Sequence, residues 1–280
     1  MSPRLLPLVA LFATTASLAA QPTAEPPYVP TPHEVVEAML ELARVGTHDV
    51  LFDLGSGDGR IPIAAARRHG TRGVGFEHQP ALVALSRARA DSAGVGHLVS
   101  FHAGDLFTAD LRPATVLALY LSGPFNLRLR PTILRQLRPG ARVVSHTFHM
   151  GEWAPDSTVH LGSGVARTTL HLWVVPAYID GFWSLRMEGS PELALEFEQA
   201  FQRARGTART ASREIPLSPV RLDGDRIEFS VPLGRRGGDL RFSGRVEGGW
   251  MGGTYHRSGR SGRWEALRFD HPRLAPLTPP

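Results

Sequence analysis

The chain has 280 residues, of which 42% are hydrophobic and 20% charged, which is typical of a globular protein with room for one large domain or two modest ones. It has no cysteine, which excludes disulfides, thiolate metal sites and a cysteine nucleophile. All 31 basic residues are arginines, and because they are scattered rather than clustered, the net charge of +5 favours a solvated surface over a nucleic-acid-binding face.

Residues 1–20 have the order of a secretory signal peptide. Arg4 precedes an apolar segment over residues 5–18, which is too short for a comfortable membrane span, and small residues follow at Ala19 and Ala20. We expect cleavage near these two alanines and a proline-rich linker over residues 21–27. This predicts export by a Sec-type signal to a periplasmic or membrane-associated location. An uncleaved anchor, leaving the protein at the cytoplasmic face of a membrane, is the alternative.

Helices and strands are expected to alternate from residue 31 onward. Thr31 and Glu34 have the spacing of a capping box at the start of a first helix. Hydrophobic patterning predicts further helices over residues 60–69, 80–93 and 127–137, and strands over residues 50–53, 73–77, 98–102, 115–121, 141–147 and 166–175. This alternation predicts an α/β, Rossmann-like domain over residues 28–177, with a mainly parallel sheet and helices on both faces.

The pattern changes after Pro176. Short segments between residues 182 and 267 alternate apolar and polar side chains, and Asp223-Gly224 is a hairpin turn signal between two of them. The segment over residues 193–201 is ambiguous, because a helix could use the same residues. We predict a small antiparallel β-rich domain over residues 178–280.

The most informative segment has the sequence DLGSGDGR, at residues 53–60. Gly55, Gly57 and Gly59 follow a short strand that contains Asp53, a layout that lets the main chain approach an adenosine-containing ligand. A dinucleotide fingerprint would need a small residue where Arg60 stands, so the spacing favours S-adenosylmethionine over NAD or FAD. The glycines would then lie against the methionine part of the cofactor, with Asp53 near its amino group.

Two further acids follow at the ends of the next two strands. Glu77 ends the second strand, where a carboxylate can accept hydrogen bonds from both ribose hydroxyls of the cofactor. Asp105 follows the third strand and could accept from the adenine amino group, while Leu106 or Phe107 packs on the ring. The alternatives are an exposed strand-end acid for Glu77 and a turn aspartate for Asp105.

Together these positions resemble a class I S-adenosylmethionine-dependent methyltransferase. Further segments resemble the ATP synthase c-subunit lysine methyltransferases and their bacterial relatives: YVPTP at residues 28–32, LYL at 119–121, LRPGARVVSH at 137–146, and Trp153. The resemblance covers about residues 28–155 and implies a protein-lysine N-methyltransferase with Tyr28 and Thr31 over the cofactor. The sequence departs from the family at residues 122–124, where relatives tend to have Leu-Pro, and in its N-terminal and β-rich segments.

Methyl transfer is an in-line displacement at a sulfonium carbon, which requires alignment of the reactants and exclusion of water. An amine acceptor must be neutral when it attacks. Tyr120 and His146, at the ends of the fourth and fifth strands, are the candidates to orient or deprotonate it, and a structural hydrogen-bonding role is the alternative for the histidine. His149 and Trp153 are expected to line the pocket. No group of residues has metal-ligand spacing, so no metal is predicted.

Two other functions stay open. One is a methyltransferase acting on a small molecule or another acceptor, and the other is a non-catalytic exported binding protein with a relic cofactor fold. The chain lacks an Asn-Pro-Pro-Tyr type tetrapeptide after the fourth strand, which argues against methylation of a nucleobase. The resemblance to lysine methyltransferases implies a protein partner, and the scattered arginines argue against a nucleic acid. Intact glycines together with Glu77 and Asp105 argue against a relic, and the sequence does not predict the oligomeric state.

Overall fold

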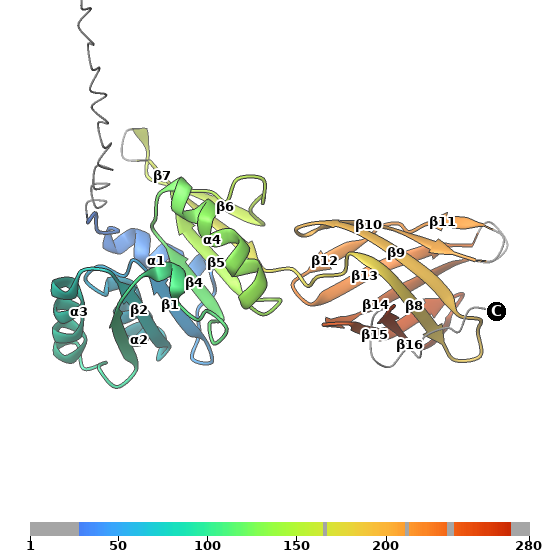
Figure 1. Ribbon diagram of the computed structural model, residues 1–280, viewed down its shortest axis with the longest axis horizontal. Coiled ribbons are helices and arrows are strands. Elements are labelled where there is room, and N and C mark those ends of the chain that lie inside the picture. The colour runs from blue at the N-terminus through green and yellow to red at the C-terminus, as the bar shows by residue number, and fades with distance from the viewer. Residues whose placement is uncertain (1–27, 165–166, 211–212, 234–237, 270–280) are drawn as a thin grey trace, which may run out of the picture.

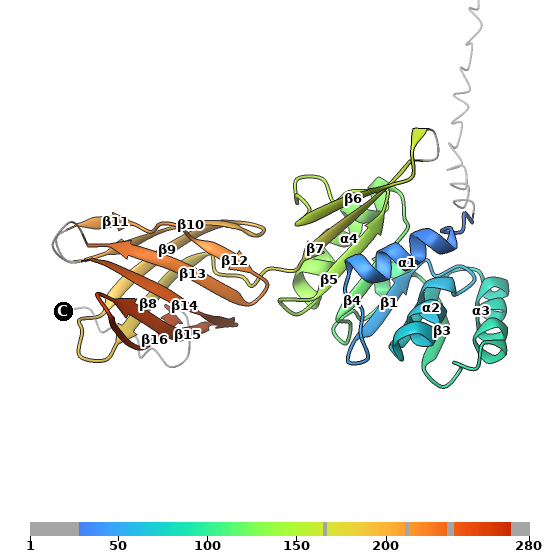
Figure 2. The same cartoon turned by 180° about the vertical axis from the view of Figure 1, so that it is seen from behind.

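The computed structural model describes residues 28–164, 167–210, 213–233 and 238–269 (Figure 1). The predicted signal peptide and linker, residues 1–27, lie outside the described residues. The described chain forms a seven-stranded mixed sheet with helices and a nine-stranded antiparallel sheet, side by side (Figures 1 and 2). Within the described ranges, no helix is long and apolar enough to cross a membrane.

The first sheet has the strand order β3-β2-β1-β4-β5-β7-β6. Its five parallel strands are β1 (Val50–Leu54), β2 (Arg72–Glu77), β3 (Val99–Ala103), β4 (Val116–Leu119) and β5 (Arg142–His146). β7 (Thr168–Val174) is antiparallel to β5, and β6 (Ser157–Leu161) is antiparallel to β7. The strand order reverses between β1 and β4, and α/β folds bind ligands at the carboxyl ends of the strands at such a point.

Helices cover both faces of this sheet. The helices are α1 (His33–Leu42), α2 (Arg60–His69), α3 (Pro80–Ser92) and α4 (Gly123–Gln136), with a 3-10 helix at Leu106–Thr108. Val116 and Ala118 of β4 pack with α1 and α2, whereas Leu117 and Leu119 pack with α4 on the opposite face. The central strands are therefore buried on both sides, and the predicted Rossmann-like fold is confirmed.

The predicted capping box at the start of α1 is wrong. The helix begins at His33, its N-cap residue is Pro32, and no side chain caps it. Thr31 is instead buried, and its hydroxyl lies 3.4 Å from Nδ1 of His146 at the end of β5. Thr31 therefore points toward the carboxyl edge of the sheet rather than toward the end of its own helix.

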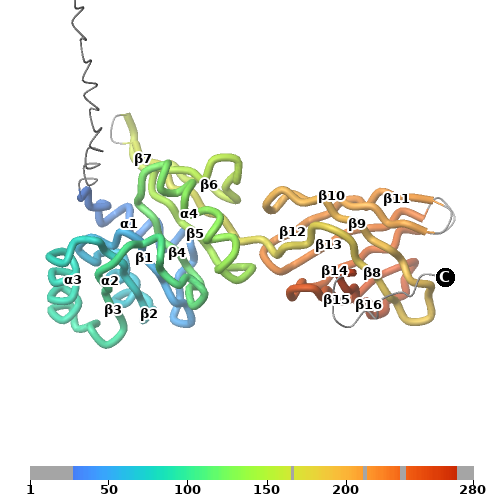
Figure 3. Tube along the Cα trace, viewed as in Figure 1, coloured from blue at the N-terminus to red at the C-terminus, as the bar shows by residue number. Residues whose placement is uncertain are grey.

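The second sheet has the strand order β11-β10-β9-β8-β16-β15-β14-β13-β12. Its strands are β8 (Gly181–Met187), β9 (Leu193–Ala200), β10 (Arg203–Arg209), β11 (Glu214–Pro216), β12 (Arg221–Asp223), β13 (Arg226–Pro232), β14 (Asp239–Glu247), β15 (Trp250–Arg257) and β16 (Arg260–Arg268). The strands curl around a common interior (Figure 3), where Phe229 stacks on Phe242 with ring centroids 4.7 Å apart. The β-rich fold is thus confirmed, and the ambiguous segment over residues 193–201 forms strand β9.

Gly224 and Asp225 form the turn between β12 and β13, where the Asp223-Gly224 signal predicts a hairpin. β10 has no such apolar signal, because its inward positions are the small residues Ala204, Gly206 and Ala208, which alternate with arginines and one threonine. A Cβ on Gly206 would lie 2.8 Å from side-chain atoms of both Leu217 and Phe197, so only a small residue fits the interior at this point.

Candidate active site

The glycine loop lies at the carboxyl end of β1. Gly55, Gly57 and Gly59 all have positive φ, at 77°, 53° and 77°. This left-handed conformation costs other residues about 1–2 kcal/mol each, so the loop needs glycine at these positions. The backbone N–H groups of Gly55 and Ser56 donate to the carbonyl oxygen of Phe76, at 2.8 and 3.0 Å, which fixes the loop beside the end of β2.

Glu77 joins the end of β2 to this loop. Its Oε2 accepts from the backbone N–H of Gly57 at 2.8 Å, and its Oε1 accepts from the backbone N–H of Gln79 at 2.9 Å. The side chain is buried, so the carboxylate is held in one orientation by two backbone donors. Each carboxylate oxygen can accept a further hydrogen bond, because a carboxylate has about four acceptor positions.

Asp53 of β1 is buried beside two other acids. Burial, followed by the nearby charges of Glu77 and Asp58, raises the pKa of Asp53 to about 8. The carboxyl group therefore carries a proton at neutral pH. A cation placed next to it would favour its ionised form.

A short segment over residues 28–31, here called the strap, crosses the glycine loop. The Tyr28 ring covers Gly57, where a Cβ would lie only 2.3 Å from Cε2 of the tyrosine. The Tyr28 hydroxyl lies near Asp58, so that burial and then the negative charge of Asp58 raise the pKa of the tyrosine, and Nη1 of Arg60 donates to the carbonyl oxygen of Thr31 at 2.6 Å. The strap is thus tied to the loop at both of its ends.

Asp58 and Arg60 hold this strap in place, and neither role was predicted from the sequence. Arg60 donates to Asp58 through Nε at 2.9 Å and through Nη2 at 2.7 Å, and Arg89 also pairs with Asp58. Burial raises the pKa of Asp58, but the hydrogen bonds and charge of Arg60 outweigh burial and lower it to about 2. The one available signal is that Arg60 stands where a dinucleotide fingerprint would have a small residue.

Asp105 and Leu106 lie at the adjacent end of β3. Asp105 is exposed, and its Oδ1 accepts from the backbone N–H of Phe107 at 2.9 Å, which caps the 3-10 helix. Leu106 and Phe107 are half-buried, and the Arg128 guanidinium lies 3.7 Å from the Phe107 ring centroid. The structure therefore places both apolar residues at the edge where an adenine ring is expected, with one Asp105 oxygen engaged by the chain itself.

Tyr120 and His146 are brought together at the ends of β4 and β5. Their rings are stacked, with centroids 4.0 Å apart and planes inclined by 27°. His146 is buried, with Nε2 lying 2.8 Å from the Thr168 hydroxyl and Nδ1 lying 3.4 Å from the Thr31 hydroxyl. Burial lowers the pKa of His146 to about 4, so the ring is neutral at pH 7. A neutral ring with a partner at each nitrogen suits holding Tyr120 in place better than accepting a proton.

We expect His146 to make the protein less stable in acid. The pKa of this ring falls from 6.5 to about 4 on folding, so between these values the unfolded chain binds a proton that the folded chain does not. The neutral His146 ring therefore makes its full contribution to the free energy of unfolding above pH 6.5, and this contribution is lost as the pH falls toward 4. Between pH 7 and 4.5 the unfolding free energy of the wild type should fall by about 2.5 kcal/mol more than that of His146→Gln. Denaturant unfolding at the two pH values measures this difference, and equal losses in both proteins would contradict it.

The segment after β5 begins in a strained conformation. Thr147 has a φ of 70°, and the backbone N–H of Phe148 donates to the carbonyl oxygen of His146 at 2.8 Å, which makes a tight γ-turn. The Asn126 Nδ2 and Ser145 Oγ groups donate to the carbonyl oxygen of Phe148, at 3.2 and 2.7 Å. The Phe148 ring lies 6.4 Å from the Tyr120 ring. Such strain in a β-branched residue gathers at functional sites, and here it turns the chain beside Tyr120.

The prediction that Trp153 lines the pocket is wrong. Trp153 is fully buried, with its ring centroid 6.0 Å from Trp173 and 5.8 Å from Phe201. It belongs to the core beneath the segment after β5 rather than to its surface. His149 is exposed on that segment, and its Nδ1 accepts from the backbone N–H of Gly151 at 3.0 Å.

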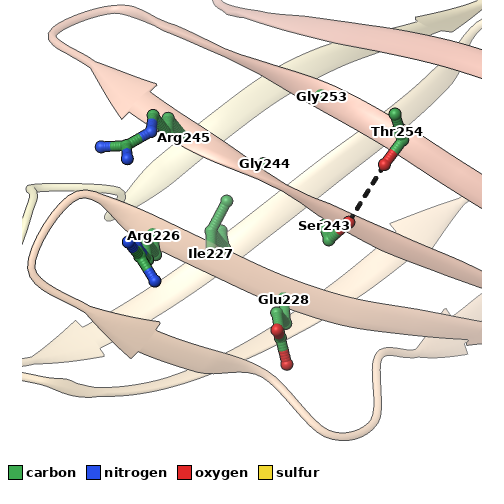
Figure 4. A pocket seen from close by; sticks show the side chains of 8 residues that line it. All are labelled: Arg226, Ile227, Glu228, Ser243, Gly244, Arg245, Gly253 and Thr254. Atoms are coloured by element: carbon green, nitrogen blue, oxygen red, sulfur yellow. Dashed lines mark hydrogen bonds between the residues drawn. The ribbon is translucent and has the colours of Figure 1, made fainter.

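A hollow of about 350 Å³ lies on the second sheet (Figure 4), where Ser243 and Thr254 are hydrogen-bonded at 3.2 Å. None of the predicted site residues lines it, so it is not part of the candidate active site. Among the described residues, no group of three or more His, Asp or Glu side chains is arranged to hold a metal ion.

A family model for the ANTKMT methyltransferase domain matches residues 53–157, which contain the end of β1, the glycine loop and all of β2 to β5. A protein-lysine N-methyltransferase from Saccharolobus islandicus is 38% identical over 150 residues, which cover 53% of this chain and 93% of the relative. The mouse adenine nucleotide translocase lysine N-methyltransferase is 37% identical over 141 residues, covering 50% of this chain and 60% of the relative.

A solved structure, titled as an RNA methyltransferase from Salinibacter ruber in complex with S-adenosylhomocysteine, is 56% identical and superposes with a TM-score of 0.52. The match covers 54% of this chain and 96% of that chain. These matches confirm the resemblance drawn from the sequence and show that the cofactor is S-adenosylmethionine. The chain belongs to the S-adenosylmethionine-dependent methyltransferases of the ANTKMT type.

Proposed function

We propose that the protein transfers a methyl group from S-adenosylmethionine to a lysine side chain of another protein. The observation that carries this proposal is the neutral aromatic surface at the ends of β4 and β5, where Tyr120 stacks on His146 with Phe148 beside them. Such a surface suits the apolar stem of a lysine. The archaeal relative, matched over 93% of its length, bears the name of a protein-lysine methyltransferase and supports the same acceptor.

The residues at the carboxyl edge fit the cofactor. The positive-φ glycines leave room that a side chain would fill, and a Cβ on Gly55 would lie 2.9 Å from Cδ2 of Leu121. Ser56 Oγ is buried and has no hydrogen-bond partner among the described residues. When bound, S-adenosylmethionine supplies a methyl carbon that is electrophilic because it is attached to a positively charged sulfur.

We assign the cofactor contacts to these same residues. Glu77 would accept from the ribose hydroxyls, Asp53 would face the amino group, and Asp105 with Leu106 would hold the adenine. The main chain of Gly55, Gly57 and Gly59 would lie against the methionine part, and the strap, with Tyr28 and Thr31, would close over it. The Tyr120 hydroxyl would orient the acceptor amine for in-line attack.

A lysine amine must lose its proton before it attacks. Burial among uncharged rings disfavours the ammonium form and lowers the pKa of a lysine. The low pKa of His146, about 4, makes this residue a poor proton acceptor at neutral pH. We therefore infer that desolvation by Tyr120, His146 and Phe148 favours the neutral amine, and that the lysine ammonium releases its proton to water before the acceptor is fully enclosed.

Labelled methyl transfer tests the acceptor. The protein is incubated with methyl-tritiated S-adenosylmethionine and extracts of its source cells, and the product is treated with protease or with ribonuclease. We expect protease to release the label and complete hydrolysis to return it as methylated lysine. The enzyme has no lysine of its own, so any methyl-lysine comes from the acceptor. Label that ribonuclease alone releases would overturn the proposal in favour of the acceptor named for the Salinibacter protein.

We expect cofactor affinity to rise with pH because of Asp53. Its carboxyl group has a pKa of about 8 in the free protein, and a cofactor ammonium beside it would favour ionisation, so binding releases a proton. Between pH 6 and 8 the affinity for S-adenosylhomocysteine should rise by up to about tenfold per pH unit, and Asp53→Asn should remove this slope. Calorimetry in buffers of different ionisation enthalpy measures the released proton. A flat wild-type profile would rule out this role for Asp53.

A further inference from the structure

The β-rich domain contacts the methyltransferase domain through two of its turns. In the β12–β13 turn, Gly224 lies against Gly140 and Val174 of the methyltransferase domain. A Cβ on Gly224 would lie 2.8 Å from Cα of Gly140, so the two backbones touch there. The β9–β10 turn carries the second contact, made by Phe201 and Gln202.

The β9–β10 turn packs on residues 147–156, here called the acceptor segment because it starts beside Tyr120. The Phe201 ring is stacked on Trp153 with centroids 5.8 Å apart and planes inclined by 10°. Nε2 of Gln202 donates to the carbonyl oxygen of Ala154 at 2.7 Å and to Oδ1 of Asp156 at 3.2 Å. One turn of the β-rich domain therefore holds the second half of this segment.

Arg130 of α4 links this contact to the first half of the acceptor segment. Its guanidinium lies 5.5 Å from the Phe201 ring centroid, and its Nη1 donates to the carbonyl oxygen of Met150 at 2.8 Å. The segment is thus fixed at its start by the turn at Thr147, in its middle by Arg130, and at its end by Phe201 and Gln202.

Phe201 holds this position at a conformational cost. Its φ is 57°, in the left-handed region that a glycine adopts freely and a phenylalanine rarely does. Nε2 of Gln199 supports the turn by donating to the carbonyl oxygen of Phe201 at 2.7 Å. The backbone at this position favours glycine, yet the residue is a phenylalanine. We take this to indicate that the ring is required for its contacts with Trp153 and Arg130.

We propose that the β9–β10 turn positions the acceptor segment, so that the β-rich domain sets the affinity for the methyl acceptor and leaves the cofactor site unchanged. Phe201 is the positioning residue, and it acts on the acceptor through Trp153 and residues 147–150. This proposal rests on the proposed function, because it assumes that Phe148, which lies beside Tyr120, faces the acceptor. It gives a role to a domain that lies outside residues 53–157, which the family model matches.

Hydrogen exchange in the full chain tests the positioning without any acceptor. Phe201→Gly removes the ring while relaxing the backbone, Phe201→Tyr keeps the stacking, and Phe182→Ala removes an exposed ring of the same sheet as a matched control. We expect amide exchange over residues 147–156 to be about tenfold faster in Phe201→Gly and unchanged in the other two variants. Affinity for S-adenosylhomocysteine should stay within about twofold in all three.

With the protein fraction that the wild type labels, Phe201→Gly should raise the acceptor KM by about fivefold or more while kcat stays within about twofold. Phe201→Tyr should restore the wild-type KM. Unchanged exchange over residues 147–156 in Phe201→Gly, or a loss of cofactor affinity in step with the rise in KM, would overturn the proposal. If the wild type labels no protein, the proposed function fails, and the exchange and cofactor measurements still decide whether the turn positions this segment.

Discussion

Glu77→Ala is expected to weaken binding of S-adenosylhomocysteine by about tenfold or more, because it removes charge-assisted hydrogen bonds worth about 1.5–3 kcal/mol each. The structure adds a second reason for the loss. The same carboxylate accepts from the backbone N–H groups of Gly57 and Gln79, so its removal also frees the glycine loop. Methyl transfer should fall with binding, and calorimetry measures the change in affinity.

Glu77→Gln separates these two contributions. A glutamine keeps one oxygen that can accept from Gly57, but it loses the charge and the second acceptor. We expect an affinity between those of the wild type and Glu77→Ala, with hydrogen exchange in the glycine loop close to that of the wild type. If Glu77→Ala binds S-adenosylhomocysteine as tightly as the wild type, Glu77 does not hold the cofactor.

Gly57→Ala should displace the strap and weaken cofactor binding by about tenfold or more. Alanine at a φ of 53° costs about 1–2 kcal/mol, and its Cβ would lie 2.3 Å from Cε2 of Tyr28. The tyrosine ring must move, which takes its hydroxyl away from Asp58. Tyrosine fluorescence, proteolysis near residue 28 and calorimetry together measure the displacement and its effect on binding.

Gly46→Ala is the matched control for this variant. Gly46 precedes β1 at the opposite edge of the sheet, and the nearest atom to an added Cβ is Oδ2 of Asp49, at 4.0 Å. This substitution should leave both the strap and cofactor affinity unchanged. Wild-type affinity in Gly57→Ala, with Tyr28 still covering the loop, would show that the strap and the glycine at position 57 are not coupled.

Local spacing was sufficient to predict which residues meet at the carboxyl edge of the first sheet. Gly55, Gly57 and Gly59 lie within one strand–turn–helix unit, and Glu77 ends the neighbouring strand, so simple rules for parallel sheets place them together. The fold class followed from the same alternation of strands and helices. The site roles of these residues stay predictions until cofactor binding is measured in the variants.

Contacts between distant segments could not be predicted in this way. The hydrogen bond from Arg60 to Thr31 joins a residue after α1 to a residue before it in the sequence. Nothing in either segment indicates that the two residues are in contact. Trp153 was expected at the pocket because its place in the sequence follows β5. Phe201, from the β9–β10 turn of the other sheet, stacks on Trp153 and helps to bury it. β10 has no apolar pattern of its own, because its inward positions are alanine, glycine and alanine, so the inward face has no large apolar residue.

All of these expectations require that the cofactor binds at the carboxyl edge of the first sheet. Titration of S-adenosylhomocysteine into the full chain, followed by calorimetry and by hydrogen exchange of the complex, tests it most directly. We expect one micromolar site per chain and slower exchange in the strap and in the glycine loop, residues 55–60. A folded protein that binds no S-adenosylhomocysteine, or that binds it with protection elsewhere, would show that the cofactor site is not at this edge.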